Sequence, residues 1–134
     1  MGPRMVKRLA IPSESQEQRW LVKWLTVHPK LKDFFCKNTN EGKRTPAQTW
    51  NLKLLGLRPG VSDLLIAFPS KSGCYAGLWL EVKRAMRYPP SAMKSDTWLA
   101  QVEWVERMKT VGFDAQFCYG WVHGKEIIER YLLS

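Results

Sequence analysis

The chain has 134 residues, and its 21 Lys and Arg against 12 Asp and Glu give a formal net charge of +9. Its length suits one domain with a single core, and 45% hydrophobic and 25% charged residues are ordinary for a globular protein. The positive charge favours a polyanionic partner, nucleic acid ahead of an anionic membrane surface.

Several protein classes are disfavoured at this stage. No apolar run approaches the ~18 residues of a membrane span, and the N-terminus lacks the apolar region of a signal peptide. Cys36, Cys74 and Cys118 form no CxxC pair, which argues against zinc and against a disulfide framework. We therefore expect a cytoplasmic protein, bacterial or phage-encoded, with no membrane contact.

The first half of the chain predicts a basic arm over 1–12, followed by a single domain over 13–134. Ser13 is a candidate N-cap for a helix in SESQEQRWLVKWL, which His28 and Pro29 end. LKDFFCKN could form a short strand, and NTNEGKRTP is a polar, basic loop. Thr45 and Pro46 then begin a second helix, which ends before Gly56.

The second half predicts two strands, VSDLLIAF and GLWLEVK, joined by a short link and therefore antiparallel. A helix in DTWLAQVEWVERMKTVG follows, with Trp98, Val102, Val105 and Met108 as its apolar row. FDAQFCYGW is a further strand, and GKEIIERYLL is a terminal helix. The fold class is α/β, a small mixed sheet flanked by helices.

Three charged residues occupy the two most apolar segments of the chain, where unpaired charge would be costly. Alternation places Glu81 and Lys83 on one face of their strand, away from Leu80 and Val82. Asp63 lies near the start of the antiparallel neighbour, so its side chain and that of Glu81 can converge.

Two converging carboxylates without His or Cys suit a hard cation, Mg²⁺ or Mn²⁺. Beside such an ion, Lys83 would orient an attacking water and offset negative charge, which is the minimal apparatus for phosphodiester hydrolysis. Simpler interpretations remain open: Glu81 and Lys83 could pair with each other on an exposed strand, and Asp63 could be a turn aspartate.

The motif combination resembles the VRR-NUC (virus-type replication-repair nuclease) branch of the PD-(D/E)XK nuclease superfamily. The resemblance spans nearly the whole chain, although each piece alone is weak. Its pieces are SE-x-x-x-Q (Ser13, Glu14, Gln18), N-x-G-K-R (Asn40 to Arg44), G-V-x-D ending at Asp63, E-V-K (Glu81 to Lys83) and Q-x-x-W (Gln101, Trp104). Ser62 stands where the superfamily often has proline.

The resemblance implies that Asp63 and Glu81 are metal ligands, with the Val82 carbonyl as a third, and that Lys83 is the catalytic lysine. Glu14 and Gln101 would support the site. In the sequence itself, Glu14 and Gln18 begin the row that Leu21 and Leu25 continue, so both should point inward. Alternatives stay open: Glu14 and Glu17 could merely complement the helix dipole, Glu17 could replace Glu14, and Gln101 could bond backbone.

The implied activity is that of a metal-dependent DNA endonuclease. Small members of this branch act as homodimers on branched DNA, which makes a four-way (Holliday) junction resolvase the leading expectation. Lys43, Arg44, Arg84 and Arg87 are the basic residues closest in sequence to the proposed site, and we expect them to contact DNA. The competing interpretations are a non-catalytic DNA-binding module and a flap or nonspecific nuclease of the same chemistry.

Overall fold

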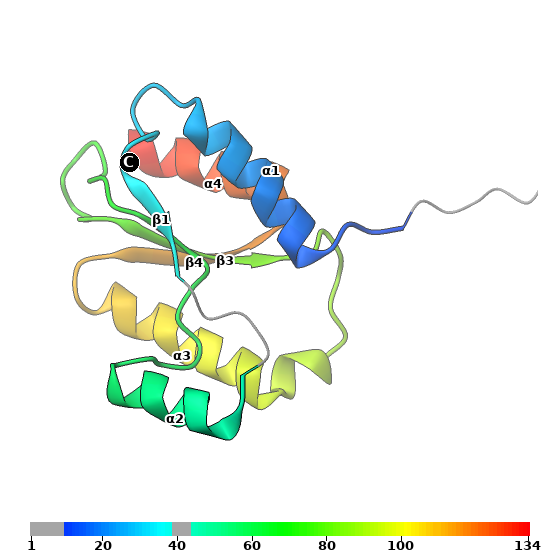
Figure 1. The fold of residues 1–134 in the computed structure, drawn as a ribbon. Coiled ribbons are helices and arrows are strands. Elements are labelled where there is room, and N and C mark those ends of the chain that lie inside the picture. Colours follow the sequence, from blue (N-terminus) through cyan, green and yellow to red (C-terminus); the bar gives the residue numbers. More distant parts are fainter. Residues whose placement is uncertain (1–9, 39–43) are drawn as a thin grey trace, which may run out of the picture.

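A four-stranded mixed sheet carries the fold, in a computed structural model that describes residues 10–38 and 44–134 (Figure 1). Arg4, Lys7, Arg8 and Lys43 lie outside the described residues, as do Asn40 and Gly42. The elements in chain order are α1 (Glu14–Thr26), β1 (Phe35–Lys37), α2 (Pro46–Leu54), β2 (Leu64–Ile66), β3 (Leu78–Lys83), a 3₁₀ turn (Ala92–Lys94), α3 (Asp96–Lys109), β4 (Asp114–Tyr119) and α4 (Trp121–Leu133).

The strands lie in the order β1-β2-β3-β4, with the first two pairings antiparallel and β3–β4 parallel. The parallel pair is joined by α3, because parallel neighbours need a long crossover. The expected α/β architecture, including the short first strand and the antiparallel pair, is confirmed.

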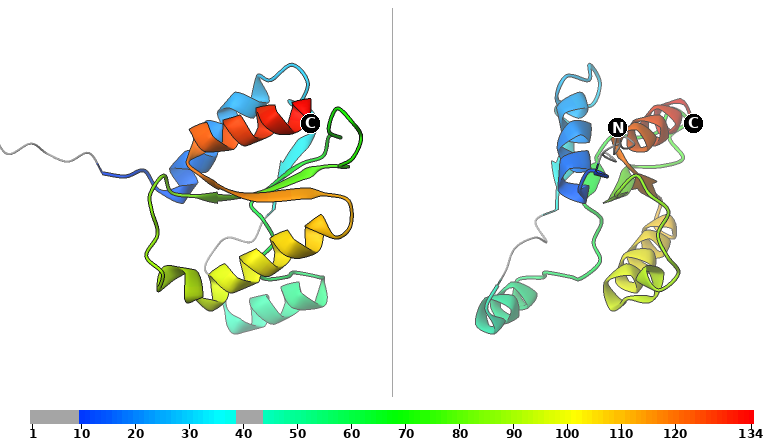
Figure 2. Two further views of the ribbon diagram at one scale, coloured as in Figure 1. Left: turned by 180° about the vertical axis from the view of Figure 1, so that it is seen from behind. Right: turned by 90° about the vertical axis from the view of Figure 1, so that its right-hand side faces the viewer.

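The helices cover both faces of the sheet (Figure 2). α1 and α4 pack together on one face, while α3 packs on β3 and β4 from the other. The apolar core lies between the sheet and the α1–α4 pair. Its members are Leu21, Leu25, Leu31, Leu64, Ile66, Leu78, Leu80, Val82, Cys118, Ile127, Ile128 and Tyr131.

Strand β3 separates two kinds of side chain. Leu78, Leu80 and Val82 belong to the apolar core. The alternate residues face α3. The ring centroids of Trp79 and Trp104 are 5.3 Å apart, and Lys83 hydrogen-bonds Gln101. The face under α3 is therefore aromatic and charged, and it is where the expected site residues lie.

Helix starts match the expectation from the sequence. The Ser13 hydroxyl accepts a hydrogen bond from the Gln16 amide, and Thr45 and Gln48 form a reciprocal capping box. Several boundaries differ by a few residues, and two of the differences change the placement of named residues. β2 covers only Leu64–Ile66, so Asp63 precedes the strand, and α4 begins at Trp121, three residues before Gly124.

The expected apolar row of α3 was wrong at one position. Val102 is 39% exposed, whereas Trp98 and Val105 are buried. The inward seam runs through Trp98, Gln101 and Val105, at spacings of three and four. A polar residue occupies the seam because Gln101 bonds the buried Lys83.

Helix α2 has no buried residue, and Trp50 and Leu54 on its surface are 65% and 69% exposed. It lies on the same side of the sheet as α3 (Figure 2). Within the described part of the chain, no helix combines the length and apolar character needed to span a bilayer.

Candidate active site

The central pair of the site sits on β3, where Glu81 and Lys83 are almost fully buried at 3% and 5% exposure. Glu81 Oε1 lies 3.8 Å from Lys83 Nζ. Burial rules out the simpler interpretation of an ion pair on an exposed strand. A charged pair in this position needs further partners.

Asp63 meets this pair from the neighbouring chain segment. The β2–β3 register pairs Leu64 with Leu80, so one further step places Asp63 across from Glu81. Asp63 Oδ2 accepts a hydrogen bond of 2.8 Å from the Val82 amide. Asp63 is thus bonded to the end of β3, next to Glu81, as the antiparallel pairing of the two segments predicted.

The electrostatics of the two carboxyl groups are unfavourable without a cation. The pKa of Glu81 is raised to about 9. Burial is the largest cause, the negative charge of Asp63 and a hydrogen bond between the two groups act in the same direction, and Lys83 opposes them. Like charges this close cannot both ionise at neutral pH unless positive charge is supplied.

One atom of the pair lacks a partner. Oε2 of Glu81 is buried and makes no hydrogen bond to any described residue. A buried carboxylate oxygen of this kind needs a ligand, and the available donors are all oxygens, the set that Mg²⁺ and Mn²⁺ prefer. The residues therefore fit such an ion. The described residues contain no cluster of three His, Cys, Asp or Glu, so a site here would need backbone or water oxygens as well.

Lys83 is held by α3 and α1. Its Nζ donates a 2.7 Å hydrogen bond to Oε1 of Gln101 and lies 4.4 Å from the centre of the Trp98 ring. Oε1 of Glu14 lies 3.9 Å from Nζ of Lys83. The ammonium thus sits among the side chains of Glu81 and Glu14, the amide oxygen of Gln101 and the ring face of Trp98.

The two glutamates of α1 have different surroundings. Glu14 reaches toward the buried Lys83 while its side chain stays 47% exposed, and Gln18, expected on the same inward row, is buried. Glu17 is the buried one: its Oε2 accepts a hydrogen bond from the Trp121 amide at the start of α4. A carboxylate stabilises the positive end of a helix, which gives Glu17 a structural role away from Lys83.

Tyr88 belongs to the site, and the sequence pattern did not single it out. Its hydroxyl donates to Oε1 of Glu14 at 3.2 Å and accepts from the Arg84 amide at 2.9 Å. Its ring lies 5.0 Å from that of Trp98. The position of Tyr88, five residues after Lys83 and next to two prolines, is the one sequence signal that could have suggested it.

A pocket of about 400 Å³ lies at the candidate site. Its walls come from α1, α2, α3, β3 and the segment before β2. The lining residues are Glu14, Thr49, Lys53, Leu57, Pro59, Gly60, Val61, Asp63, Glu81, Thr97 and Gln101. Four site residues named from the sequence, Glu14, Asp63, Glu81 and Gln101, therefore line one space.

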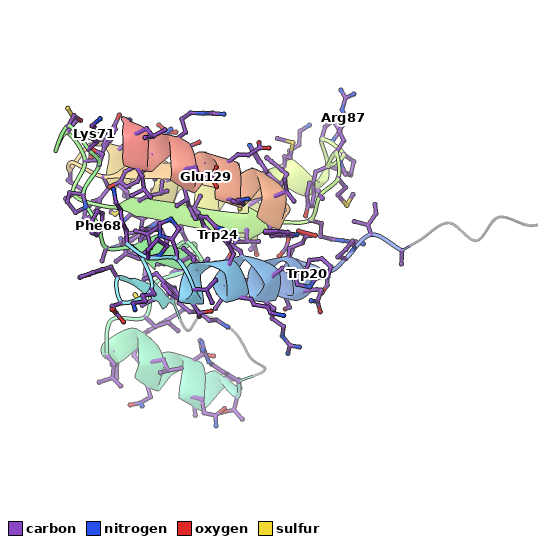
Figure 3. All side chains as sticks on the ribbon, turned by 90° about the horizontal axis from the view of Figure 1, so that it is seen from above. Trp20, Trp24, Phe68, Lys71, Arg87 and Glu129 are labelled. Atoms are coloured by element: carbon purple, nitrogen blue, oxygen red, sulfur yellow. The ribbon has the colours of Figure 1, made fainter. Side chains whose placement is uncertain are left out.

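The basic residues expected to contact DNA fall into three groups. The Arg84 guanidinium donates to the carbonyl oxygens of Pro12 and Ile11 at 3.1 and 2.8 Å, so it anchors the segment that leads into α1. Arg87 is exposed, at the opposite end of the molecule from Lys71 (Figure 3). Arg44 is half-buried just before α2, and Lys43 lies outside the described residues.

Comparison with known proteins identifies the fold. No protein-family model matches the chain, and no curated protein matches it. A solved structure described as "VRR_NUC domain protein" superposes with a TM-score of 0.74 and 22% sequence identity, over 92% of this chain and 91% of the other. The expected VRR-NUC type of α/β fold is therefore confirmed.

Proposed function

We propose that this protein is a Mg²⁺- or Mn²⁺-dependent DNA endonuclease with Asp63, Glu81 and Lys83 at its centre. One observation carries the proposal. The carboxyl groups of Asp63 and Glu81 lie across from each other beside Lys83, and the buried Oε2 of Glu81 makes no hydrogen bond to any described residue. The net charge of +9 and the fold shared with a VRR_NUC domain protein support the same activity.

The metal-binding residues would be Asp63 and Glu81, with the carbonyl of Val82 as a further oxygen. When bound, a divalent ion supplies charge for the phosphodiester and lowers the pKa of water. Asp63 contributes in a second way, because its bond to the Val82 amide fixes the end of β3 relative to the segment before β2.

Lys83 is the candidate catalytic lysine. Gln101 and Glu14 hold its ammonium next to Glu81, where it would hydrogen-bond the attacking water or a phosphate oxygen and offset charge that develops on phosphorus. Tyr88 positions Glu14 and acts only through it. Burial around Lys83 strengthens these interactions because less water screens them.

The substrate we propose is branched DNA, with a four-way junction as the leading candidate, cut by a homodimer. Two sites related by a twofold axis match the symmetry of such a junction. Exposed Trp50 and Leu54 on α2 supply apolar surface of the kind that subunits bury. Arg87, Arg44 and Lys43 would contact the phosphate backbone, with Arg84 as an anchor at the edge of that surface.

The deciding experiment is a panel of labelled linear, nicked, flapped and four-way DNAs, incubated with Mn²⁺, with Mg²⁺ or with EDTA. Wild type should introduce paired symmetrical nicks into the four-way junction only when a divalent ion is present, and Glu81→Gln should bind the junction without cutting it. Intact DNA throughout the panel, with binding preserved, would leave a non-catalytic DNA-binding module. Equal cutting of linear duplex would identify a nonspecific nuclease.

A further inference from the structure

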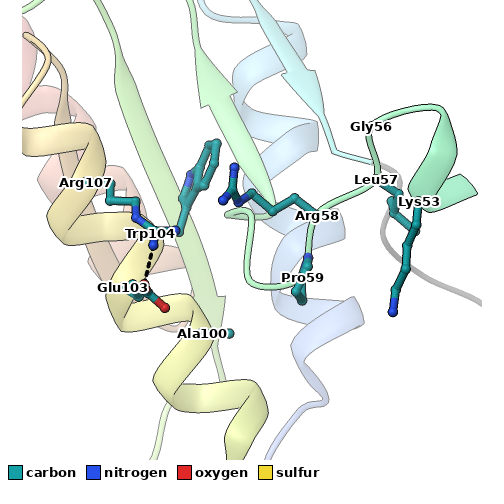
Figure 4. A pocket seen from close by; sticks show the side chains of 9 residues that line it. All are labelled: Lys53, Gly56, Leu57, Arg58, Pro59, Ala100, Glu103, Trp104 and Arg107. Atoms are coloured by element: carbon teal, nitrogen blue, oxygen red, sulfur yellow. Dashed lines mark hydrogen bonds and ion pairs between the residues drawn. The ribbon is translucent and has the colours of Figure 1, made fainter.

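A second pocket adjoins the candidate active site. It has a volume of about 580 Å³ and lies between α3 and the segment that follows α2 (Figure 4). The residues that line it are Lys53, Gly56, Leu57, Arg58, Pro59, Ala100, Glu103, Trp104 and Arg107. Lys53, Leu57 and Pro59 line both pockets, so the two spaces are adjacent.

The walls of this second pocket are fixed by close packing. Gly60 has a φ of 82°, and a Cβ there would lie 2.4 Å from the backbone carbonyl of Ala100 on α3. The turn that carries Arg58 can approach α3 this closely only with glycine at that position. On the other wall, Trp104 packs edge-on against Trp79 of β3. Arg58 and Trp104 point toward each other across the pocket (Figure 4).

The charge of this pocket favours an anion. Its lining contains three cationic side chains, those of Lys53, Arg58 and Arg107. Glu103 is the one carboxylate among these lining residues, and it pairs with Arg107 one helical turn away. Three positive charges against one negative charge leave an excess of two, and arginine forks match the geometry of phosphate oxygens.

We propose that this second pocket binds a backbone phosphate of the DNA strand, flanking the phosphodiester that is cut. The inference rests on the proposed function, because the strand must pass from the active-site pocket into the adjoining one. Lys53 stands at the boundary, and Arg58 and Arg107 reach the flanking phosphate. The contact is to the backbone, so it sets the register of the strand and carries no base preference.

The test combines protein variants with neutral phosphates. Junction strands carry one uncharged methylphosphonate at each position in turn, and binding is measured in EDTA, so that no cleavage is needed. In wild type, one or two positions should weaken binding roughly tenfold, the size of a lost charged hydrogen bond. The Arg58→Gln, Arg107→Gln double variant should bind natural DNA more weakly and show no further loss at those positions.

Two matched variants control for net charge. Lys71→Gln removes one charge from an exposed position in the turn between β2 and β3, and it should keep the full methylphosphonate penalty. Glu103→Gln removes the carboxylate that pairs with Arg107 and should tighten binding severalfold. The double variant should also lower the slope of log affinity against log salt by roughly 2, about one for each cation, and Lys71→Gln should leave it nearly unchanged.

The proposal is overturned if the double variant shows the same penalties, position by position, as wild type, or if Glu103→Gln does not tighten binding. It is also overturned if wild type does not bind DNA. Failure of the nuclease proposal looks different: the binding pattern persists, and addition of Mn²⁺ cuts nothing.

Discussion

Asp63, just before β2, lies across from Glu81 on β3. The carboxylate of Asp63 also accepts a hydrogen bond from the Val82 amide. One side chain thus has two separable tasks. It fixes the backbone of β3, and under the proposed function it would also supply an oxygen for a cation.

Replacing Asp63 in two ways separates these tasks. Asp63→Asn keeps an oxygen acceptor for the Val82 amide, so the protein should stay folded while cleavage falls at least about 100-fold. Asp63→Ala leaves that amide unpaired and should cost a further ~1–3 kcal/mol in the free energy of unfolding. Cleavage assays and urea denaturation measure the two effects. Asp33→Asn, on an exposed turn, is the control; normal cleavage by Asp63→Asn would remove Asp63 from the metal site.

The raised pKa of Glu81 predicts a stability that depends on pH in the metal-free protein. With a pKa of about 9 in the folded protein and 4.5 as the ordinary value, the native state holds a proton that the unfolded chain releases. Stability should therefore be fully present below about pH 4.5 and be lost as the pH rises toward 9, with a slope of at most about 1.4 kcal/mol per pH unit from this group.

Thermal unfolding in EDTA between pH 6 and 9 measures this slope. Glu81→Gln should flatten it, and Mn²⁺ should raise the melting temperature of wild type while leaving Glu81→Gln nearly unchanged. A wild-type profile that stays flat in EDTA would contradict the shift.

Tyr88 is predicted to act through Glu14. Tyr88→Phe keeps the ring beside Trp98 and removes the hydroxyl that joins Glu14 to the Arg84 amide. We expect a loss of about 1 kcal/mol in stability and a several-fold fall in kcat with little change in KM, because Glu14 loses its orientation beside Lys83. Tyr75→Phe, at an exposed tyrosine in the connection between β2 and β3, is the control. Unchanged kcat would reduce Tyr88 to a packing residue.

Helix α2 makes the proposed homodimer testable. Its nine residues include none that is buried, and a helix this short is marginal without a partner. Trp50→Glu with Leu54→Glu should yield a monomer that cuts one strand of a junction without the matching second nick. Sedimentation velocity and the ratio of paired to single nicks give the answer. Val122→Glu, at an exposed apolar site on α4, is the control, and an α2 variant that sediments like wild type would place the interface elsewhere.

The sequence predicts those parts of the fold that local chemistry specifies. Ser13 and the pair Thr45–Pro46 mark helix starts because capping is local, and the apolar alternation of β3 fixes which residues share a face. Glu81 and Lys83 stand out in the sequence because charge is costly in an apolar strand.

The remaining features depend on packing between distant segments. Val102 is apolar and fits the spacing of a core residue, but it is exposed. The inward side of α3 passes through Gln101 instead, because Gln101 bonds Lys83 on β3. Glu17 is buried because α4 begins beside it, and the Arg84 guanidinium is engaged by carbonyls more than 70 residues away. No periodicity within one helix or loop contains that information.

The bond from Arg84 to the carbonyls of Ile11 and Pro12 has a practical consequence. It fastens the segment entering α1 to the residue that follows Lys83, so the described part of the chain begins beside the candidate active site. Ser134, by contrast, accepts a hydrogen bond from the Ser72 amide on the far hairpin. A fluorophore or surface tether belongs on that end, where it would leave the approach of DNA unobstructed.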